Sequence, residues 1–158
     1  MKQFNAIELT RIVAMLFLCQ IISDATFCQE SSPVNWQFQL VKKTQDSFEI
    51  HFKATVQSPW HTYSQFTPEG GPIPTSFKFT KNPLVRLAGP VKENGSLKTI
   101  NDPVFSVEVK YFQGNVDFVQ IVKVLGKAKT SIRGEIEFMV CNDKECMPPK
   151  TIPFNIVL

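Results

Sequence analysis

The sequence has none of the motifs that mark hydrolytic or group-transfer chemistry. It contains no Ser-His-Asp arrangement, no paired acidic motif and no glycine-rich phosphate loop. Its only histidines, His51 and His61, are not spaced with the cysteines as zinc ligands are, so a metal site is not indicated. We therefore expect no cofactor, no bound metal and no small-molecule substrate.

The sequence also has little excess of charge of either sign. The 158 residues include 17 lysines and arginines against 14 aspartates and glutamates, which leaves a formal net charge of only +3. No run of basic residues interleaved with aromatics occurs, and such runs mark phosphate-tracking grooves and polybasic membrane patches. The sequence therefore indicates no nucleic-acid partner.

Long hydrophobic runs are missing as well. An apolar run from Ile12 to Cys19 follows Arg11 near the N-terminus, but a membrane-spanning helix needs about 20 such residues. A short run followed by a small-x-small pattern, here at residues 23–25, is typical of a signal peptide. We predict that residues 1–28 are a cleaved signal peptide and that residues 29–158 form one mature domain, in the periplasm or secreted. An uncleaved N-terminal anchor is the alternative.

Helical periodicity is absent from the mature region, where apolar and polar residues alternate with a period of two. This alternation is typical of half-buried antiparallel strands. Core-facing strand surfaces are predicted within residues 36–40, 48–56, 77–79, 105–111, 132–140 and 152–158. Residues 116–124 are apolar on both faces, which predicts a central strand. About seven or eight strands at this spacing predict an all-β fold of two packed antiparallel sheets.

Turn residues separate the predicted strands. Residues 68–72 combine two prolines with two glycines and predict a long loop. Asn94-Gly95 has the composition of a tight β-hairpin turn, so we predict a turn at this point.

Four cysteines are present, and two of them, Cys19 and Cys28, lie within or beside the predicted signal peptide. The other two, Cys141 and Cys146, lie in a segment that predicts a strand, a four-residue turn and a second strand. Residues that face each other across such a hairpin have Cα atoms about 4.5–5.5 Å apart, a separation that a disulfide accepts. In an oxidising compartment the two thiols are expected to form a disulfide at least part of the time.

Strand alternation also predicts where the sulfur atoms lie. Phe138 and Val140 belong to the core-facing set, so Cys141 is expected on the opposite face, with its sulfur near the surface. A β-bulge before Cys141 would reverse this expectation. A disulfide that closes so short a loop adds roughly 2 kcal/mol of stability, against about 4.7 kcal/mol for a loop of a hundred residues. The pair therefore suits thiol–disulfide exchange better than stabilisation, with an inert disulfide as the alternative.

Several short motifs make the chain similar to a known family. They lie at residues 60–63 (Trp-His-Thr-Tyr), 70–75 (Gly-Gly-Pro-Ile-Pro-Thr) and 102–105 (Asp-Pro-Val-Phe), and in the segment from Cys141 to Pro149. With these motifs in this order on an all-β pattern, residues 34–158 resemble the N-terminal periplasmic domain of the thiol:disulfide interchange protein DsbD. The resemblance implies an immunoglobulin-like β-sandwich that relays electrons by dithiol–disulfide exchange.

The same resemblance implies roles for particular residues. Cys146 would form the mixed disulfide with partners, and Cys141 would resolve it. Asp102 and Phe105 would belong to a cap loop that shields the sulfur atoms, with Tyr63 in the cleft beneath. The partners would be thioredoxin-fold periplasmic proteins and a membrane-linked disulfide reductase. Because Phe105 also alternates with the valines that follow it, a plain core position is the alternative for this side chain.

Two functions from different classes are consistent with these observations. The first is a redox carrier that exchanges its disulfide with partners; since the sequence shows no membrane channel and no thioredoxin-like domain, its reductant is expected on another protein. The second is a non-catalytic secreted immunoglobulin-like binding module, whose disulfide only pins the hairpin. Whether the chain acts as an enzyme, as one component of a protein-disulfide reductase, is left open by the sequence.

Overall fold

Short antiparallel strands make up the fold. The computed structural model describes residues 32–102, 105–127 and 129–158, so the predicted signal peptide and Cys28 lie outside the described residues. Within them there are ten strands and no helix. The strands are β1 (Val34–Lys42), β2 (Ser47–Val56), β3 (His61–Tyr63), β4 (Ser76–Phe79), β5 (Val85–Leu87), β6 (Lys92–Asn101), β7 (Glu108–Val124), β8 (Ser131–Phe138), β9 (Val140–Cys141) and β10 (Lys150–Val157).

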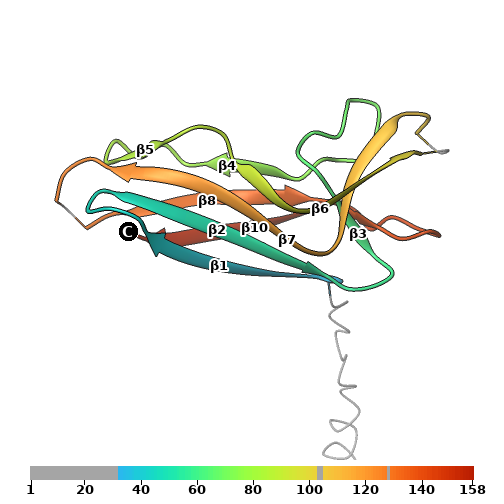
Figure 1. The fold of residues 1–158 in the computed structure, drawn as a ribbon, viewed down its shortest axis with the longest axis horizontal. Coiled ribbons are helices and arrows are strands. Elements are labelled where there is room, and N and C mark those ends of the chain that lie inside the picture. Colours follow the sequence, from blue (N-terminus) through green and yellow to red (C-terminus); the bar gives the residue numbers. More distant parts are fainter. Residues whose placement is uncertain (1–31, 103–104, 128) are drawn as a thin grey trace, which may run out of the picture. The chain divides into compact units, whose positions relative to one another are not determined.

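The strands form two antiparallel sheets, which Figure 1 shows as two layers. The larger sheet has seven strands: β2 and β3 pair with successive parts of one edge of β7, β1 pairs with β2 and β9 pairs with β3. β5 and β6 pair with the other edge of β7. The smaller sheet has three strands in the order β10, β8 and β4. The prediction of an all-β, immunoglobulin-like sandwich of two antiparallel sheets is confirmed.

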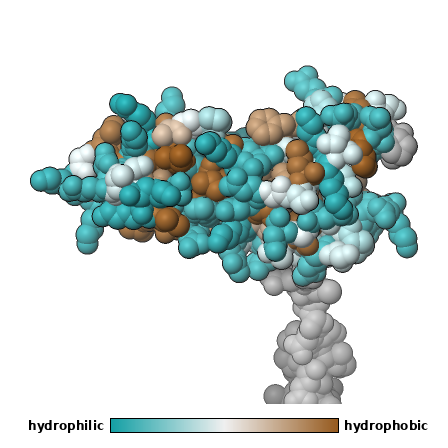
Figure 2. Space-filling model, in the orientation of Figure 1, coloured by the Kyte–Doolittle hydropathy of each residue, from teal (hydrophilic) through white to brown (hydrophobic). Residues whose placement is uncertain are grey.

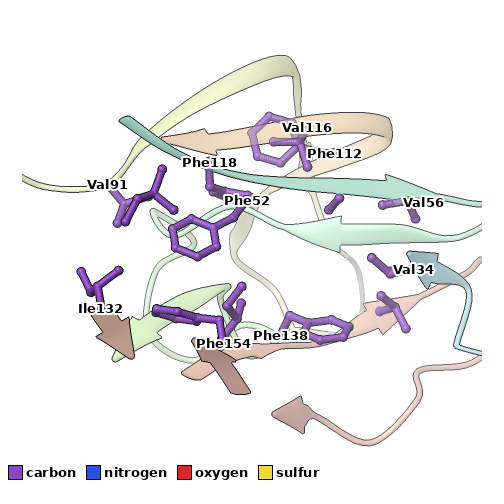
Figure 3. Close-up of a cluster of buried hydrophobic side chains, with 14 of the residues drawn as sticks. Val34, Phe52, Val56, Val91, Phe112, Val116, Phe118, Ile132, Phe138 and Phe154 are labelled. Carbon is purple, nitrogen blue, oxygen red and sulfur yellow. The ribbon is translucent and has the colours of Figure 1, made fainter. Parts of the chain in front are cut away.

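The space between the two sheets is filled by aromatic and aliphatic side chains (Figure 3). Phe52 of β2 packs its ring against Phe154 of β10 and Phe77 of β4, with ring centroids 4.9 and 5.1 Å apart. The alternation predicted for residues 48–56 and 132–140 is confirmed, because every second residue of these segments lies on the core side. Aromatic side chains of this size bury about 150–250 Å² each, so these contacts hold the two sheets together.

β7 is the central strand that the apolar residues 116–124 predicted, and it is 17 residues long. Its C-terminal part pairs with β2 on one edge and with β5 and β6 on the other. Its N-terminal part pairs with β3 and with the end of β6. One strand therefore connects the aromatic core with the end of the larger sheet that carries β3 and β9.

The predicted hairpin turn at Asn94-Gly95 is wrong. Both residues lie inside β6, where Asn94 pairs with Asp117 and Gly95 pairs with Val116. A Cβ atom on Gly95 would lie 3.1 Å from the ring of Phe112, and the pairing register of β6 shifts directly after this glycine. Glycine is needed here because the strand passes close to an aromatic ring at an irregular point of the ladder.

The chain changes sheets after β8. β8 belongs to the smaller sheet and ends at Phe138, and after Met139 the two residues of β9 pair with β3 of the larger sheet. In this pairing Val140 lies opposite Thr62, and the backbone N–H of Met147 donates a hydrogen bond of 2.9 Å to the carbonyl oxygen of Val140. The change of sheet therefore carries the cysteine segment onto the larger sheet.

Exposed apolar side chains are scattered over the surface. On the face shown in Figure 2, hydrophobic residues are interspersed with hydrophilic ones. Among the residues that the structure describes, the most exposed large apolar ones are Val157 and Phe66, at 69% and 63%. Single apolar residues at the surface are normal for folded proteins. No helix in the described part of the chain is long and apolar enough to cross a membrane.

Gly134 provides a test of how closely the smaller sheet is packed. It lies in the middle of β8, and a Cβ atom there would overlap the backbone oxygen of Lys78 and the ring of Phe154. We predict that Gly134→Ala lowers the free energy of unfolding by about 2–3 kcal/mol, because the backbone of β4 and a core ring would both have to move. Urea unfolding followed by circular dichroism measures this change.

The matched control is Arg133→Ala, which changes an exposed neighbour in the same strand. It is expected to alter the free energy of unfolding by no more than about 0.5 kcal/mol. Equal stability of the two variants would contradict the packing described for Gly134.

Candidate functional site

Cys141 and Cys146 form a disulfide with an S–S distance of 2.04 Å and a Cα–Cα distance of 4.0 Å, which confirms the predicted pairing. Cys141 ends β9, and Cys146 forms an isolated antiparallel bridge with it. Asn142 orders the turn between them: its side-chain oxygen accepts hydrogen bonds from the N–H groups of Lys144 and Glu145, at 2.8 and 2.9 Å. The two sulfur atoms are thus held together by a regular tight hairpin.

The two cysteines differ in exposure. Cys141 is only 2% exposed, whereas Cys146 is an exposed residue. The prediction that the sulfur of Cys141 lies near the surface is therefore wrong. The alternation itself holds, because Val140 belongs to the main core and Cys141 faces away from it. What the alternation could not predict is that other side chains cover this second face.

The cover is a second hydrophobic cluster on the far face of the larger sheet. Tyr63 of β3, Val109 of β7 and Cys141 of β9 are its buried members, and Val107, Tyr111 and Met139 pack around them. Their neighbours in the ladder, Thr62, Phe112 and Val140, are buried on the side of the main core. At this end of the molecule β3, β9 and the adjoining part of β7 therefore bury side chains on both faces of the larger sheet.

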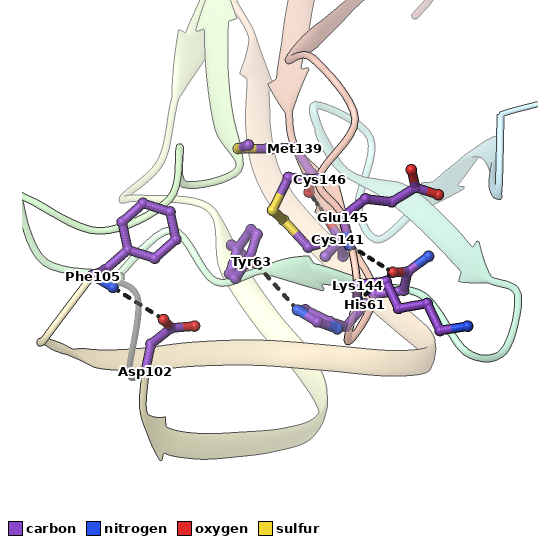
Figure 4. The surroundings of a disulfide bond; sticks show 11 residues. His61, Tyr63, Asp102, Phe105, Met139, Cys141, Lys144, Glu145 and Cys146 are labelled. Carbon is purple, nitrogen blue, oxygen red and sulfur yellow. Dashed lines mark hydrogen bonds between the residues drawn. A yellow bond between two sulfur atoms is a disulfide. The ribbon is translucent and has the colours of Figure 1, made fainter.

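A cavity of about 430 Å³ opens beside the disulfide (Figure 4). It is lined by His61, Tyr63, Ile100, Asp102, Phe105 and the hairpin from Cys141 to Cys146. The structure therefore brings together all five residues that the sequence proposed for the site, which are Tyr63, Asp102, Phe105, Cys141 and Cys146. Their roles remain predictions.

Hydrogen bonds connect Asp102 with Phe105 and with Val107. The carboxylate of Asp102 accepts a hydrogen bond of 3.1 Å from the N–H of Phe105, and the N–H of Asp102 donates one of 3.0 Å to the carbonyl oxygen of Val107. Ser106 has a left-handed backbone conformation, with φ of 56°. The ring of Phe105 is half-buried and lines the cavity, outside both described core clusters, so the alternative of a plain core position is not supported.

His61 is a site residue that the sequence analysis did not identify. It lies directly opposite Cys141 in the ladder between β3 and β9. Its Nε2 atom is hydrogen-bonded to the hydroxyl group of Tyr63 at 3.1 Å, and its ring lies 4.8 Å from that of Tyr111. The signal was present in the motif at residues 60–63, where His61 and Tyr63 share one strand face. The pairing of this motif with Cys141 was not apparent from the sequence.

Burial shifts the acid–base properties of the two polar rings. It lowers the pKa of His61 below the ordinary value of 6.5, and the carboxylates of Asp143 and Asp102 partly oppose this shift. Burial also raises the pKa of Tyr63 to about 12, with Asp102 adding to the effect. At neutral pH the imidazole is therefore mainly uncharged and the phenol holds its proton. Within the described residues, no group of three or more His, Cys, Asp or Glu side chains is arranged to hold a metal ion.

The comparison with protein families shows what kind of domain carries this site. A family model described as the N-terminal part of the thiol:disulfide interchange protein DsbD matches residues 26–157. The chain belongs to this DsbD N-terminal family. The resemblance inferred from the short motifs is thereby confirmed. A comparison with curated proteins finds no match.

Solved structures show the same fold. The N-terminal periplasmic domain of ScsB from Proteus mirabilis is 13% identical with a TM-score of 0.60, and the match covers 81% of this chain and 47% of that chain. This chain therefore spans about half the length of the ScsB structure. The DsbD N-terminal domain of Neisseria meningitidis, in its reduced form, is 15% identical with a TM-score of 0.50 over 77% of this chain and 83% of that chain.

Protonation of His61 provides a test of the burial of this DsbD-family site. Because the pKa of His61 is lower in the folded state than in the unfolded chain, the unfolded chain binds the proton more tightly. The stability of the folded state therefore falls as the pH decreases through 6.5, until the folded-state pKa is passed. We predict that His61→Gln loses less stability between pH 7.5 and pH 5 than the wild type, as measured by urea unfolding.

A direct measurement complements that comparison. The NMR titration of the His61 ring in the oxidised protein should give a pKa below 6.5. A value at or above 6.5, or parallel losses of stability in wild type and variant, would contradict the described environment of this side chain.

Proposed function

We propose that this DsbD N-terminal domain relays electrons through Cys141 and Cys146, from a membrane-linked disulfide reductase to thioredoxin-fold proteins of the periplasm. The observation that carries the proposal is the unequal exposure of the two sulfur positions. The exposed Cys146 is joined to the buried Cys141 beside a cavity of about 430 Å³. A disulfide with one accessible end can be attacked by a partner's thiolate at that end.

The exchange proceeds in two balanced halves. A thiolate of the reductase attacks Cys146, the bond between Cys146 and Cys141 breaks, and Cys141 departs with the electron pair. A second thiolate of the reductase then releases Cys146, which leaves the reductase oxidised and this domain as a dithiol. In the second half, the Cys146 thiolate attacks a partner's disulfide, and Cys141 attacks Cys146 to restore the original bond and release the reduced partner. Each attack requires a thiolate, so proton transfer accompanies every step.

Asp102 and Phe105 are proposed to belong to a cap that shields the disulfide between encounters with partners. Phe105 lines the same cavity as the two cysteines, and its N–H donates a hydrogen bond to the carboxylate of Asp102 (Figure 4). A side chain in this position would limit the approach of small thiols, whereas a partner protein could displace it.

The proposed compartment follows from the same function. We propose that residues 1–28 direct export as a cleaved signal peptide and that residues 29–158 act in the periplasm or as a secreted domain. In an oxidising compartment a dithiol persists only when a partner keeps reducing it. The proposed membrane-linked reductase has this role.

A structural disulfide in a binding module is the competing function. The bridge closes a sequence separation of only 5 residues, and so short a loop contributes roughly 2 kcal/mol in the chain-entropy account. Stabilisation alone is therefore a weak reason for the bridge, and we favour exchange.

Trapping variants test the relay. Cys141→Ser leaves the exposed Cys146 as a lone thiol, so we predict that it accumulates a mixed disulfide with an oxidised thioredoxin-fold protein on a non-reducing gel. Cys146→Ser leaves only the buried Cys141 and should accumulate little or none. The reduction potential of the wild-type pair should be less negative than about −300 mV, the level typical of structural disulfides. Absence of trapping by both variants, together with a potential below that level, would favour the binding module.

The shielding role of Phe105 has its own test. Phe105→Ala should accelerate the reduction of the disulfide by dithiothreitol severalfold, because the ring lines the cavity beside the sulfur atoms. Phe66→Ala is the matched control, since it removes the same side chain from an exposed site that does not line this cavity. Equal reduction rates for Phe105→Ala and the wild type would contradict the proposed shielding role of Phe105.

A further inference from the structure

We infer that His61 is the proton acceptor for Cys141 when that thiol attacks the mixed disulfide at Cys146. The inference rests on the proposed function and deepens it, because it assigns the group that prepares the buried cysteine for its attack. It is carried by the placement of His61 opposite Cys141 and by the chemistry of the other groups around the cavity.

His61 lies beside the buried cysteine. His61 and Cys141 are direct partners in the antiparallel ladder of β3 and β9, and both line the same cavity. Residues directly opposite each other in such a ladder have Cβ atoms about 4.5–5.5 Å apart, with side chains on the same face. Cys146 is the bridge partner of Cys141 on its other side. The three residues His61, Cys141 and Cys146 therefore form a row across the strands, as Figure 4 shows.

The thiol of Cys141 needs a proton acceptor. Cys141 is buried with Tyr63 and Val109, and the carboxylates of Asp102 and Asp143 lie around the same cavity. An apolar environment with carboxylates nearby disfavours a thiolate. The reduced Cys141 is therefore a thiol, and it must give up its proton before it can attack.

The other titratable groups that face His61 are poorly suited to take this proton. Carboxylates such as Asp102, Asp143 and Glu145 are much weaker bases than imidazole. The phenol of Tyr63 holds its own proton, and Tyr111 presents its ring to His61. Lys144 also lines the cavity, and an ammonium group donates hydrogen bonds but has no lone pair to accept a proton. Among the described residues that line the cavity, His61 is thus the base best matched to a thiol.

The proton transfer precedes the attack of Cys141 on Cys146. In the mixed disulfide, Cys146 is bonded to a sulfur atom of the partner, and Cys141 is a thiol. The proton of Cys141 moves to the uncharged imidazole of His61, and the Cys141 thiolate attacks the sulfur of Cys146. The bond between Cys141 and Cys146 forms, the bond to the partner breaks, and the partner's sulfur leaves with the electron pair. The imidazolium then passes its proton to this departing thiolate or to water.

The surroundings support both protonation states of His61. Burial keeps the imidazole uncharged and ready to accept a proton, while the carboxylates of Asp143 and Asp102 stabilise the imidazolium once it has formed. The hydrogen bond between Nε2 and the Tyr63 hydroxyl, at 3.1 Å, restrains the ring. Tyr63 is itself held by Thr75, whose hydroxyl donates a hydrogen bond of 2.6 Å to its carbonyl oxygen.

The test follows the two thiols separately with a small disulfide, 5,5′-dithiobis(2-nitrobenzoate). The reduced protein attacks this reagent through Cys146 and releases one coloured thiolate at a rate that depends on reagent concentration. Cys141 then displaces the second coloured thiolate within the molecule, at a rate independent of reagent concentration. Cys141→Ser should release only the first equivalent, which assigns the second phase to Cys141.

We expect His61→Gln to slow the second phase about a hundredfold at pH 7, at the lower end of what positioned acid–base groups contribute, with the first phase unchanged. In the wild type the second-phase rate should be constant above pH 6.5 and fall only at lower pH, once the pH drops below the lowered pKa of His61. In the variant it should rise about tenfold per pH unit, because only the ionised fraction of Cys141 reacts. Added imidazole should restore part of the rate in His61→Gly.

His51→Gln is the matched control, because the ring of His51 is hydrogen-bonded to Asp117 at 2.7 Å and does not line the cavity. It should leave both phases unchanged. Equal second phases and parallel pH profiles in wild type and His61→Gln would overturn the inference alone. A wild-type protein without any second phase would instead overturn the proposed function. Should His61→Gln fail to fold, the pH dependence of the wild-type second-phase rate decides. A plateau above pH 6.5 supports the role of His61, and a tenfold rise in rate per pH unit rejects it.

Discussion

The pairing of β9 with β3 is the contact on which the site depends. It involves only two residue pairs, Cys141 with His61 and Val140 with Thr62. Because successive residues of a strand point to opposite faces, this short ladder sends Val140 into the main core and Cys141 to the other side. The hydroxyl of Thr62 reinforces it by donating a hydrogen bond of 3.1 Å to the carbonyl oxygen of Met139, where the chain leaves the smaller sheet. The position of the disulfide is therefore set by the core packing of its neighbours.

A loop far from the cysteines in sequence supports the same region. Thr75, at the end of the Gly-Gly-Pro-Ile-Pro-Thr motif, holds the backbone of Tyr63 by a hydrogen bond. A Cβ atom on Gly71 would lie 3.2 Å from the side chain of Val107, so this loop packs closely on the end of the segment that carries Phe105. The cavity is lined by residues of three family motifs, those at 60–63, 102–105 and 141–149, and the motif at 70–75 supports it from outside. Their joint presence in the sequence has a structural reason, since each positions a neighbour of the disulfide.

Much of the fold was predictable because long strands show their alternation. Phe52, Phe138 and Phe154 occupy the core positions that their period of two implies. β3 and β5 were not predicted as strands, since three residues are too few to show a period. β9 was predicted as the end of one continuous strand with β8, and its transfer to the other sheet was not. For the site, alternation correctly gave the face of Cys141 but not its burial, because burial depends on residues brought over it by other parts of the chain.

The role of His61 was hidden for the same reason. Its distance from the cysteines along the chain argued only against a zinc site, and nothing in the local pattern indicated that β3 and β9 are neighbours. Gly95 is the opposite case, in which a local pattern was strong and misleading. Asn-Gly is a good turn signal, but the ring of Phe112 beneath the strand explains the glycine without any turn. Contacts between distant segments decided both positions.

The unequal exposure of the two cysteines also limits how the domain can be used. In the proposed relay, a donor and an acceptor of electrons have to occupy the same small area of surface, since Cys146 is the exposed end of the bridge and Cys141 is buried beneath it. They cannot be bound there together. The exchange is then of the ping-pong type, in which each partner protein departs before the next one binds. An excess of either partner slows turnover with the other.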